Sequence, residues 1–201
     1  MVESPEVIYR RAIQVADAEG RLPMPPVAEW DTFPFDGDLR TRPLVPPTTT
    51  ERQRNGEDPA ECWRCQQGTS DAVWSDQNWL VAPLAEPSGL PVVVILYPRA
   101  HHDLGDLPMD LLTELGPLMQ RIERAITSLG EIGRVHACRW GDGSAHFHVW
   151  FVARPARLPQ TVGGFAMVWD DILPPVPERI WRESLTELGR RLAADGGARH
   201  A

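Results

Sequence analysis

Short apolar runs and one long amphipathic stretch dominate the pattern of hydrophobic and polar positions between residues 72 and 157. The run "LPVVVILYP" has the length of a buried strand, and "DAVWSDQNWLVAPLA" predicts two short strands joined by a turn at residues 76–78. Apolar residues recur with helical spacing through "LPMDLLTELGPLMQRIERAITSLG", which predicts a long helix. Two further strands are expected in "GRVHACRWG" and "SAHFHVWFVARP". The order of elements favours an antiparallel α+β sheet with one long helix packed on it.

The regions on either side of this core have a different character. Residues 5–20 suit a short amphipathic helix, and residues 21–60 are rich in proline, threonine and charge. We expect the latter to be an extended arm that wraps the domain, with a flexible part near residues 48–58. Its aromatic residues are expected to dock on the core or on a partner chain: Trp30, Phe33 and Phe35.

The tail is expected to end in a helix over about residues 177–194. The predicted division is therefore an N-terminal helix and arm (1–60), a core domain (61–157) and a C-terminal extension (158–201). Within the extension, Trp169, Asp170 and Asp171 could close over a substrate base or bind a divalent cation; a helix-entry segment with capping acids is the plainer alternative.

Composition excludes some classes of function. The chain has 201 residues, a formal net charge of −8 and a pI near 5.2, which argues against general binding to a nucleic-acid backbone. No apolar stretch reaches the roughly 18–20 residues needed to span a bilayer, and the acidic N-terminus does not resemble a secretory signal. Two of the three cysteines form a CxxC motif rather than a disulfide framework. We therefore expect a cytoplasmic protein with reduced thiols.

Two histidines lie one residue apart in an apolar run, at positions 146 and 148. If residues 144–155 form a strand, both imidazoles point to the same face of the sheet. Two imidazoles on one side of a buried strand suggest a purpose beyond packing. Two satisfied core histidines are the plainer alternative.

The CxxC motif, Cys62-Trp63-Arg64-Cys65, has the spacing of a zinc knuckle. A redox pair or two unrelated core cysteines are the alternatives. His101 and His102 follow the apolar strand, and His146 opens the last predicted strand. Two cysteines and two histidines would complete a closed structural zinc site.

These pieces together resemble the histidine-triad superfamily. They are "CWRC", "LYPRAHHDL", the helix over residues 108–129 and "GDGSAHFHVW", and they cover about residues 60–157. The resemblance implies an α+β core with a five-stranded antiparallel sheet and one long packed helix. It also implies chemistry at a nucleotide phosphate and a possible homodimer.

Individual residues follow from the resemblance. It implies a structural zinc ion held by Cys62, Cys65, His101 and His146. It implies that His148 is the nucleophile, attacking the α-phosphorus to form a nucleotidyl-histidine intermediate. The two neighbouring histidines would then have separate tasks, one in binding metal and one in catalysis.

The third position of the triad is Trp150, where most relatives have histidine and the galactose-1-phosphate uridylyltransferase branch has glutamine. An indole can donate one hydrogen bond but cannot accept or shuttle a proton. It could therefore stabilise developing charge, or it is only a large hydrophobe on the sheet. In the preceding loop, Gly143, Ser144 and Arg139 are candidate phosphate-binding residues. A simple Gly-Asp-Gly turn and a solvated arginine are the alternatives.

The sequence thus predicts a nucleotidyl hydrolase or transferase acting on a nucleoside phosphate, dinucleoside polyphosphate or nucleotide conjugate. The alternative is a nucleotide-binding module with weak or no catalysis, because of Trp150. A zinc-stabilised interaction protein is the third hypothesis, and it leaves His148 unexplained. No nucleic-acid or membrane partner is expected.

Overall fold

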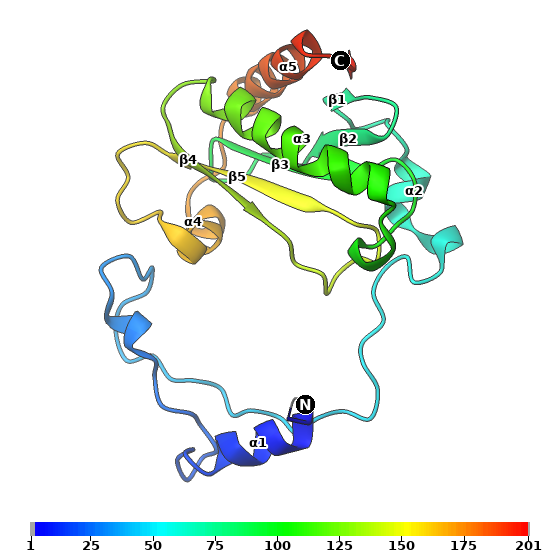
Figure 1. Ribbon diagram of the computed structural model, residues 1–201. Coiled ribbons are helices and arrows are strands. Elements are labelled where there is room, and N and C mark those ends of the chain that lie inside the picture. The colour runs from blue at the N-terminus through cyan, green and yellow to red at the C-terminus, as the bar shows by residue number, and fades with distance from the viewer. Residues whose placement is uncertain (1–2, 201) are drawn as a thin grey trace. The chain divides into compact units, whose positions relative to one another are not determined.

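Six strands form one antiparallel sheet in the computed structural model, which describes residues 3–200 (Figure 1). The strands are β1 (Trp74–Ser75), β2 (Trp79–Pro83), β3 (Val92–Pro98), β4 (Ile132–Cys138), β5 (Val149–Pro155) and β6 (Ala198–Arg199), in the order β4-β5-β3-β2-β1-β6. The α-helices are α1 (Pro5–Ile13), α2 (Trp63–Gln67), α3 (Met109–Thr127), α4 (Ala166–Ile172) and α5 (Glu178–Ala194). The predicted α+β architecture is confirmed, with one strand more than expected.

The sixth strand comes from the end of the chain. Ala198 and Arg199 pair with Ser75 and Trp74, so the tail extends the sheet beyond β1. Gly189 of α5 lies so close to β1 that an added Cβ would be 2.5 Å from the carbonyl oxygen of Val73. The tail is therefore built into the sheet and its covering layer.

The chain divides into two compact units between Arg52 and Gln53. The predicted domain boundaries at residues 60 and 157 stay a prediction. Residues just after the division already bond to the core, since the Asn55 backbone N–H donates to the Gly143 carbonyl at 3.0 Å. Residues 53–200 thus include both the start of the predicted core and the predicted extension.

The first unit contains α1, whose N-terminus is capped by Ser4. The helix predicted over residues 5–20 ends at Ile13. Soon afterwards the Asp17 carboxylate accepts from the backbone N–H groups of Glu19 and Arg21, which turns the chain. The docking of the arm's aromatic residues stays a prediction.

Strand β3 is buried along its whole length because both of its faces are covered. Val92, Val94 and Leu96 face the large core that α3 and α5 cover. The stripe of α3 predicted from its periodicity supplies buried side chains to this core: Leu111, Leu118, Ile122 and Ile126. Figure 1 shows α3 lying along one face of the sheet.

The opposite face of β3 presents Ile95 and Tyr97. These pack with Leu80 of β2 and, from β5, with Trp150. A smaller apolar cluster on the same side involves α4. There the buried Asp170 carboxylate accepts from the Leu90 backbone N–H at 2.7 Å, which favours a structural role for that acid.

The last long strand begins later than predicted, at Val149 rather than Ser144. The backbone of the preceding residues bonds to loops instead of to a neighbouring strand. The Ala145 N–H donates to Asn55 at 2.9 Å, and the Phe147 N–H donates to His102 at 2.6 Å. His146 and His148 therefore lie in a buried extended segment that leads into β5.

None of the helices within residues 3–200 combines the length and apolar character that crossing a bilayer requires.

Candidate functional site

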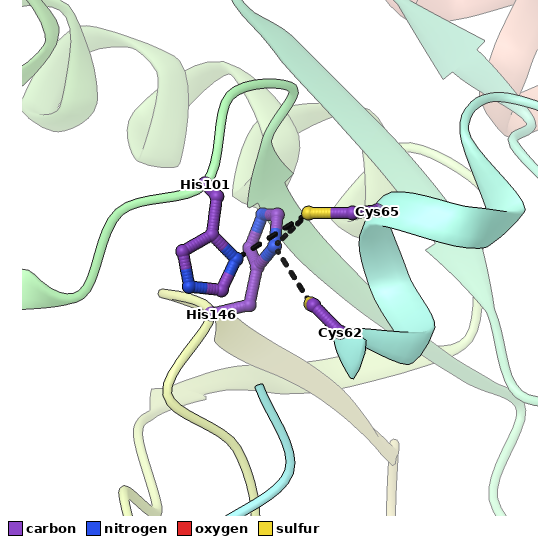
Figure 2. Close-up of side chains that lie close together, drawn as sticks. All are labelled: Cys62, Cys65, His101 and His146. Atoms are coloured by element: carbon purple, nitrogen blue, oxygen red, sulfur yellow. Dashed lines mark hydrogen bonds between the residues drawn. The ribbon is translucent and has the colours of Figure 1, made fainter. Parts of the chain in front are cut away.

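Four predicted metal ligands converge on one point, as Figure 2 shows. The ligand atoms of Cys62, Cys65, His101 and His146 all lie within 4.8 Å of one another. The His146 Nδ1 atom is 3.4 Å from the Cys62 sulfur and 3.5 Å from the Cys65 sulfur. The His101 Nδ1 atom is 3.3 Å from the Cys65 sulfur. Separations of this size match the edges of a tetrahedron of sulfur and nitrogen donors around zinc.

The four ligands come from three segments of the chain. Cys62 is the N-cap residue of α2, and Cys65 lies one turn later in that helix. His101 follows the end of β3, and His146 precedes β5. The metal-binding geometry therefore depends on the tertiary fold, although CxxC is local.

His146 is prepared for metal binding by its surroundings. Its Nε2 lies 2.8 Å from the Pro98 carbonyl oxygen, which can only accept, so the proton is on Nε2 and the Nδ1 lone pair faces the sulfurs. Burial lowers the pKa of His146 to about 4, which keeps the ring neutral at pH 7. A neutral imidazole with a second-shell carbonyl is a typical zinc ligand.

The surroundings of Cys65 disfavour its thiolate form. Burial and the adjacent Cys62 raise the pKa of the Cys65 thiol to about 11. A bound cation is what would favour the thiolate form. Gly56 closes over the cluster with φ +80°, and an added Cβ would lie 3.2 Å from the Cys62 sulfur and 3.2 Å from a ring carbon of His101. The donor set fits a structural zinc ion.

His148 has different neighbours. It is 7% exposed and lines a cavity of about 430 Å³. Its Nδ1 lies 2.9 Å from the His146 carbonyl oxygen, and its Nε2 lies 2.9 Å from the Trp140 carbonyl oxygen. The two histidines therefore face different sites.

The cavity is largely aromatic. Four aromatic side chains line it beside His148: Trp63, Tyr97, Trp140 and Trp150. Arg64, Asn55, Gly143 and Ser144 complete the lining. Trp63 and Trp140 are about half exposed, and the rings of Trp140 and Trp150 meet edge to face at 5.8 Å. Flat aromatic walls of this kind suit a planar ring system.

Three predicted substrate-binding residues occupy different positions. Gly143 and Ser144 line the cavity, and the Ser144 hydroxyl oxygen accepts from the His146 backbone N–H at 3.2 Å. Arg139 is not among the residues that line the cavity. Its guanidinium pairs with Asp103 at 2.5 Å and lies over the Phe147 ring. In this conformation Arg139 therefore acts within the loop structure and not in the cavity.

Arg64 is the main site residue that sequence reasoning missed. It is 3% exposed, forms a two-pronged pair with Asp71 and lies 5.0 Å from the centre of the Tyr97 ring. Within residues 3–200 its buried Nε–H has no hydrogen-bond partner. The sequence did indicate Arg64 indirectly. It lies between the two cysteines of the CxxC motif, so the helix that positions Cys62 and Cys65 also positions Arg64.

Known proteins were compared with the chain. No protein-family model matches it, and no curated protein matches it significantly. Similar solved structures include a zinc-bound histidine triad family protein from Mycobacterium smegmatis, at 22% identity and a TM-score of 0.47, over 67% of this chain and 95% of the other. A histidine triad protein from Bradyrhizobium japonicum is 18% identical, with a TM-score of 0.49, over 62% and 92% of the two chains. A uridylyltransferase is 16% identical, with a TM-score of 0.44, over 66% and 45%. In structure the chain is similar to histidine triad proteins, the family that its motifs resemble.

Proposed function

We propose that the protein is a nucleotidyl hydrolase or transferase in which His148 forms a covalent nucleotidyl intermediate. One observation carries the proposal: His148 borders an aromatic cavity, while His146, two residues earlier, completes a cluster of four metal donors. The substrate would be a nucleoside phosphate, a dinucleoside polyphosphate or a nucleotide conjugate. A homodimer and a cytoplasmic location stay predictions.

The first step would be attack of the His148 Nε2 lone pair on the α-phosphorus. An N–P bond forms, and the bond from phosphorus to the leaving group breaks, with the electron pair going to that group. Water or another acceptor then attacks phosphorus, the N–P bond breaks with its electron pair returning to Nε2, and the acceptor oxygen releases its proton to solvent. Two displacements replace one difficult displacement. The carbonyl of His146, 2.9 Å from Nδ1, would hold the other ring nitrogen as a donor.

The metal site would contribute rigidity. A zinc ion bound by Cys62, Cys65, His101 and His146 has no open position, so it would supply no Lewis-acid chemistry to the substrate. The ligands at 101 and 146 belong to the segments that flank the cavity. Their cross-link would hold His148 in place.

Trp150 narrows the range of substrates. It lines the cavity and can donate an N–H to a phosphoryl oxygen, but it has no proton to transfer to a departing group. Leaving groups that depart without a proton, such as the phosphate of an anhydride, should therefore react better than amines.

The test is to incubate the protein with adenylylated and uridylylated compounds and to look for a nucleotidyl adduct by intact mass and peptide mapping. We expect the adduct on His148 and none in His148→Ala. His136→Ala is the matched control, because His136 lies on β4 and does not line the cavity. Absence of both turnover and adduct in the wild type would refute the proposal.

A nucleotide-binding module without catalysis is the second candidate, and Trp150 is the observation that favours it. In that case nucleoside monophosphates would raise the melting temperature of the wild type and of His148→Ala equally. Hydrolysis that disappears in His148→Ala would exclude this candidate.

A further inference from the structure

The proposed nucleophile is held between two backbone carbonyls. One lies 2.9 Å from Nδ1 and belongs to His146; the other lies 2.9 Å from Nε2 and belongs to Trp140. While the second carbonyl is there, Nε2 either carries a proton that it donates to Trp140 or points its lone pair at an oxygen. In neither arrangement can Nε2 reach phosphorus. The loop that carries Trp140, residues 139–144, must therefore move before His148 can react.

The segment around Trp140 is tied to one carboxylate, while Gly143, further along the loop, is held by the Asn55 backbone N–H at 3.0 Å. Asp103 accepts from the Arg139 guanidinium at 2.5 Å, next to Trp140 in the chain. Its second oxygen accepts from Arg54 at 2.6 Å, and Arg54 also donates to the Gly141 carbonyl at 3.3 Å. Both ends of the segment around Trp140 are thus connected to Asp103, directly on one side and through Arg54 on the other.

Asp103 is itself held firmly. Its backbone N–H donates to the Asp106 carboxylate at 2.6 Å, and its own carboxylate accepts from the Leu104 N–H at 2.7 Å. The side chains of Arg54, Asp103 and Arg139 are each only about a quarter exposed, between 26 and 28%. Water weakens charge-assisted hydrogen bonds between such partly buried groups less than it weakens ion pairs on the surface.

We propose that Asp103 is a positioning residue, which through Arg54 and Arg139 keeps the Trp140 carbonyl against His148 Nε2. Release of this clamp is then a gating step before nucleotidyl transfer. Only one part of this inference, the role of His148 as nucleophile, rests on the proposed function. The clamp can be tested without any substrate.

The experiment compares wild type with Asp103→Asn, which keeps the size of the side chain and removes its charge. The readout is the rate at which diethyl pyrocarbonate modifies His148, followed by peptide mapping so that the other histidines are scored separately. We expect modification of His148 to become about tenfold faster, since charge-assisted bonds are lost from the closed loop. Arg139→Gln should give a similar increase.

Glu57→Gln is the matched control. Glu57 pairs with the same Arg54 at 2.7 Å but does not touch Asp103, so the rate at His148 should stay within about twofold of wild type. Metal content is measured for every variant, to separate loop release from damage at His101. An unchanged rate in Asp103→Asn and Arg139→Gln with metal retained would overturn the clamp, as would an equal increase in Glu57→Gln.

The same variants separate this inference from the proposed function. If nucleotidyl adduct forms, it should form faster in Asp103→Asn by a factor similar to that for chemical modification. If modification accelerates and no protein forms an adduct with any substrate, the clamp stands and the proposed function fails.

Discussion

His146 and His148 are two residues apart, yet their surroundings have opposite properties. His146 is 1% exposed, with one ring nitrogen facing Pro98 and the other facing two sulfurs. His148 lines a cavity, and the Trp140 carbonyl oxygen lies 2.9 Å from its Nε2. An imidazole enclosed by sulfur donors suits a structural ligand, and an imidazole that lines a cavity suits a reactive one.

The contrast extends to the regions around each ring. The metal cluster gathers four donors from three segments and is closed by Gly56. The cavity is walled by aromatic rings and contains one buried arginine, Arg64. The metal cluster would thus cross-link three segments of the chain, and the aromatic cavity would provide a surface for a ligand. Variants that affect one region and spare the other test this separation.

Loss of a metal ligand should have the largest effect. Cys62→Ser should lose the metal and about 4 kcal/mol or more of unfolding free energy, because structural zinc sites contribute roughly 10–16 kcal/mol of binding energy to folding. Elemental analysis and denaturant unfolding would measure both. Cys138→Ser, on β4 and outside the cluster, is the control and should keep the metal. A wild-type protein that melts identically with and without metal would contradict a structural ion.

Acid should destabilise the metal-free protein through His146. The pKa of His146 in the folded state, about 4, is below the ordinary value of 6.5, so between these pH values the unfolded state binds more protons. Stability is therefore fully present above pH 6.5 and falls as the pH drops towards 4, by on the order of 3 kcal/mol. Urea unfolding at a series of pH values measures this slope. His146→Gln should flatten this slope.

Replacement of Arg64 should lower the free energy of unfolding by a smaller amount, because water can solvate the carboxylate of its partner, Asp71. Arg64→Met leaves the Asp71 carboxylate, which is 33% exposed, without its cation, and we expect a loss of about 2 kcal/mol with the metal retained. Arg99→Met is the control: Arg99 is exposed, and its guanidinium donates to backbone oxygens of the 76–77 turn. Equal losses in both variants would mean that the buried pair has no special role.

The smallest effect is expected at Trp150. Trp150→Phe keeps an aromatic wall and removes one N–H donor, so adduct formation should slow by about fivefold, the equivalent of one neutral hydrogen bond. Trp181→Phe, in the α5 layer and away from this cavity, should leave the rate unchanged. An unchanged rate in Trp150→Phe would reduce Trp150 to a packing residue.

Periodicity and motif spacing were sufficient to predict most of the fold and the cluster of candidate metal donors. The apolar run became β3, the amphipathic stretch became α3, and the four candidate ligands came together. Such features are local: a strand, a helix stripe or a CxxC turn is encoded by residues close in the chain, and the few separated ligands were marked by their residue type.

Only the tertiary structure decided what lies around His148. The bonds of Ala145 to Asn55 and of Phe147 to His102 delay β5 until Val149, and no periodicity could show them. The pairing of Arg139, a candidate for phosphate binding, with Asp103 likewise joins residues 36 positions apart, and no local pattern indicated it. Backbone carbonyls and ion pairs find partners by proximity in space, and many partners are chemically equivalent along the sequence. The sequence by itself therefore indicated the candidates for binding metal and for attacking phosphorus. The folded chain decided that His146 lies between two sulfurs and the Pro98 carbonyl, and that the Trp140 carbonyl lies against Nε2 of His148.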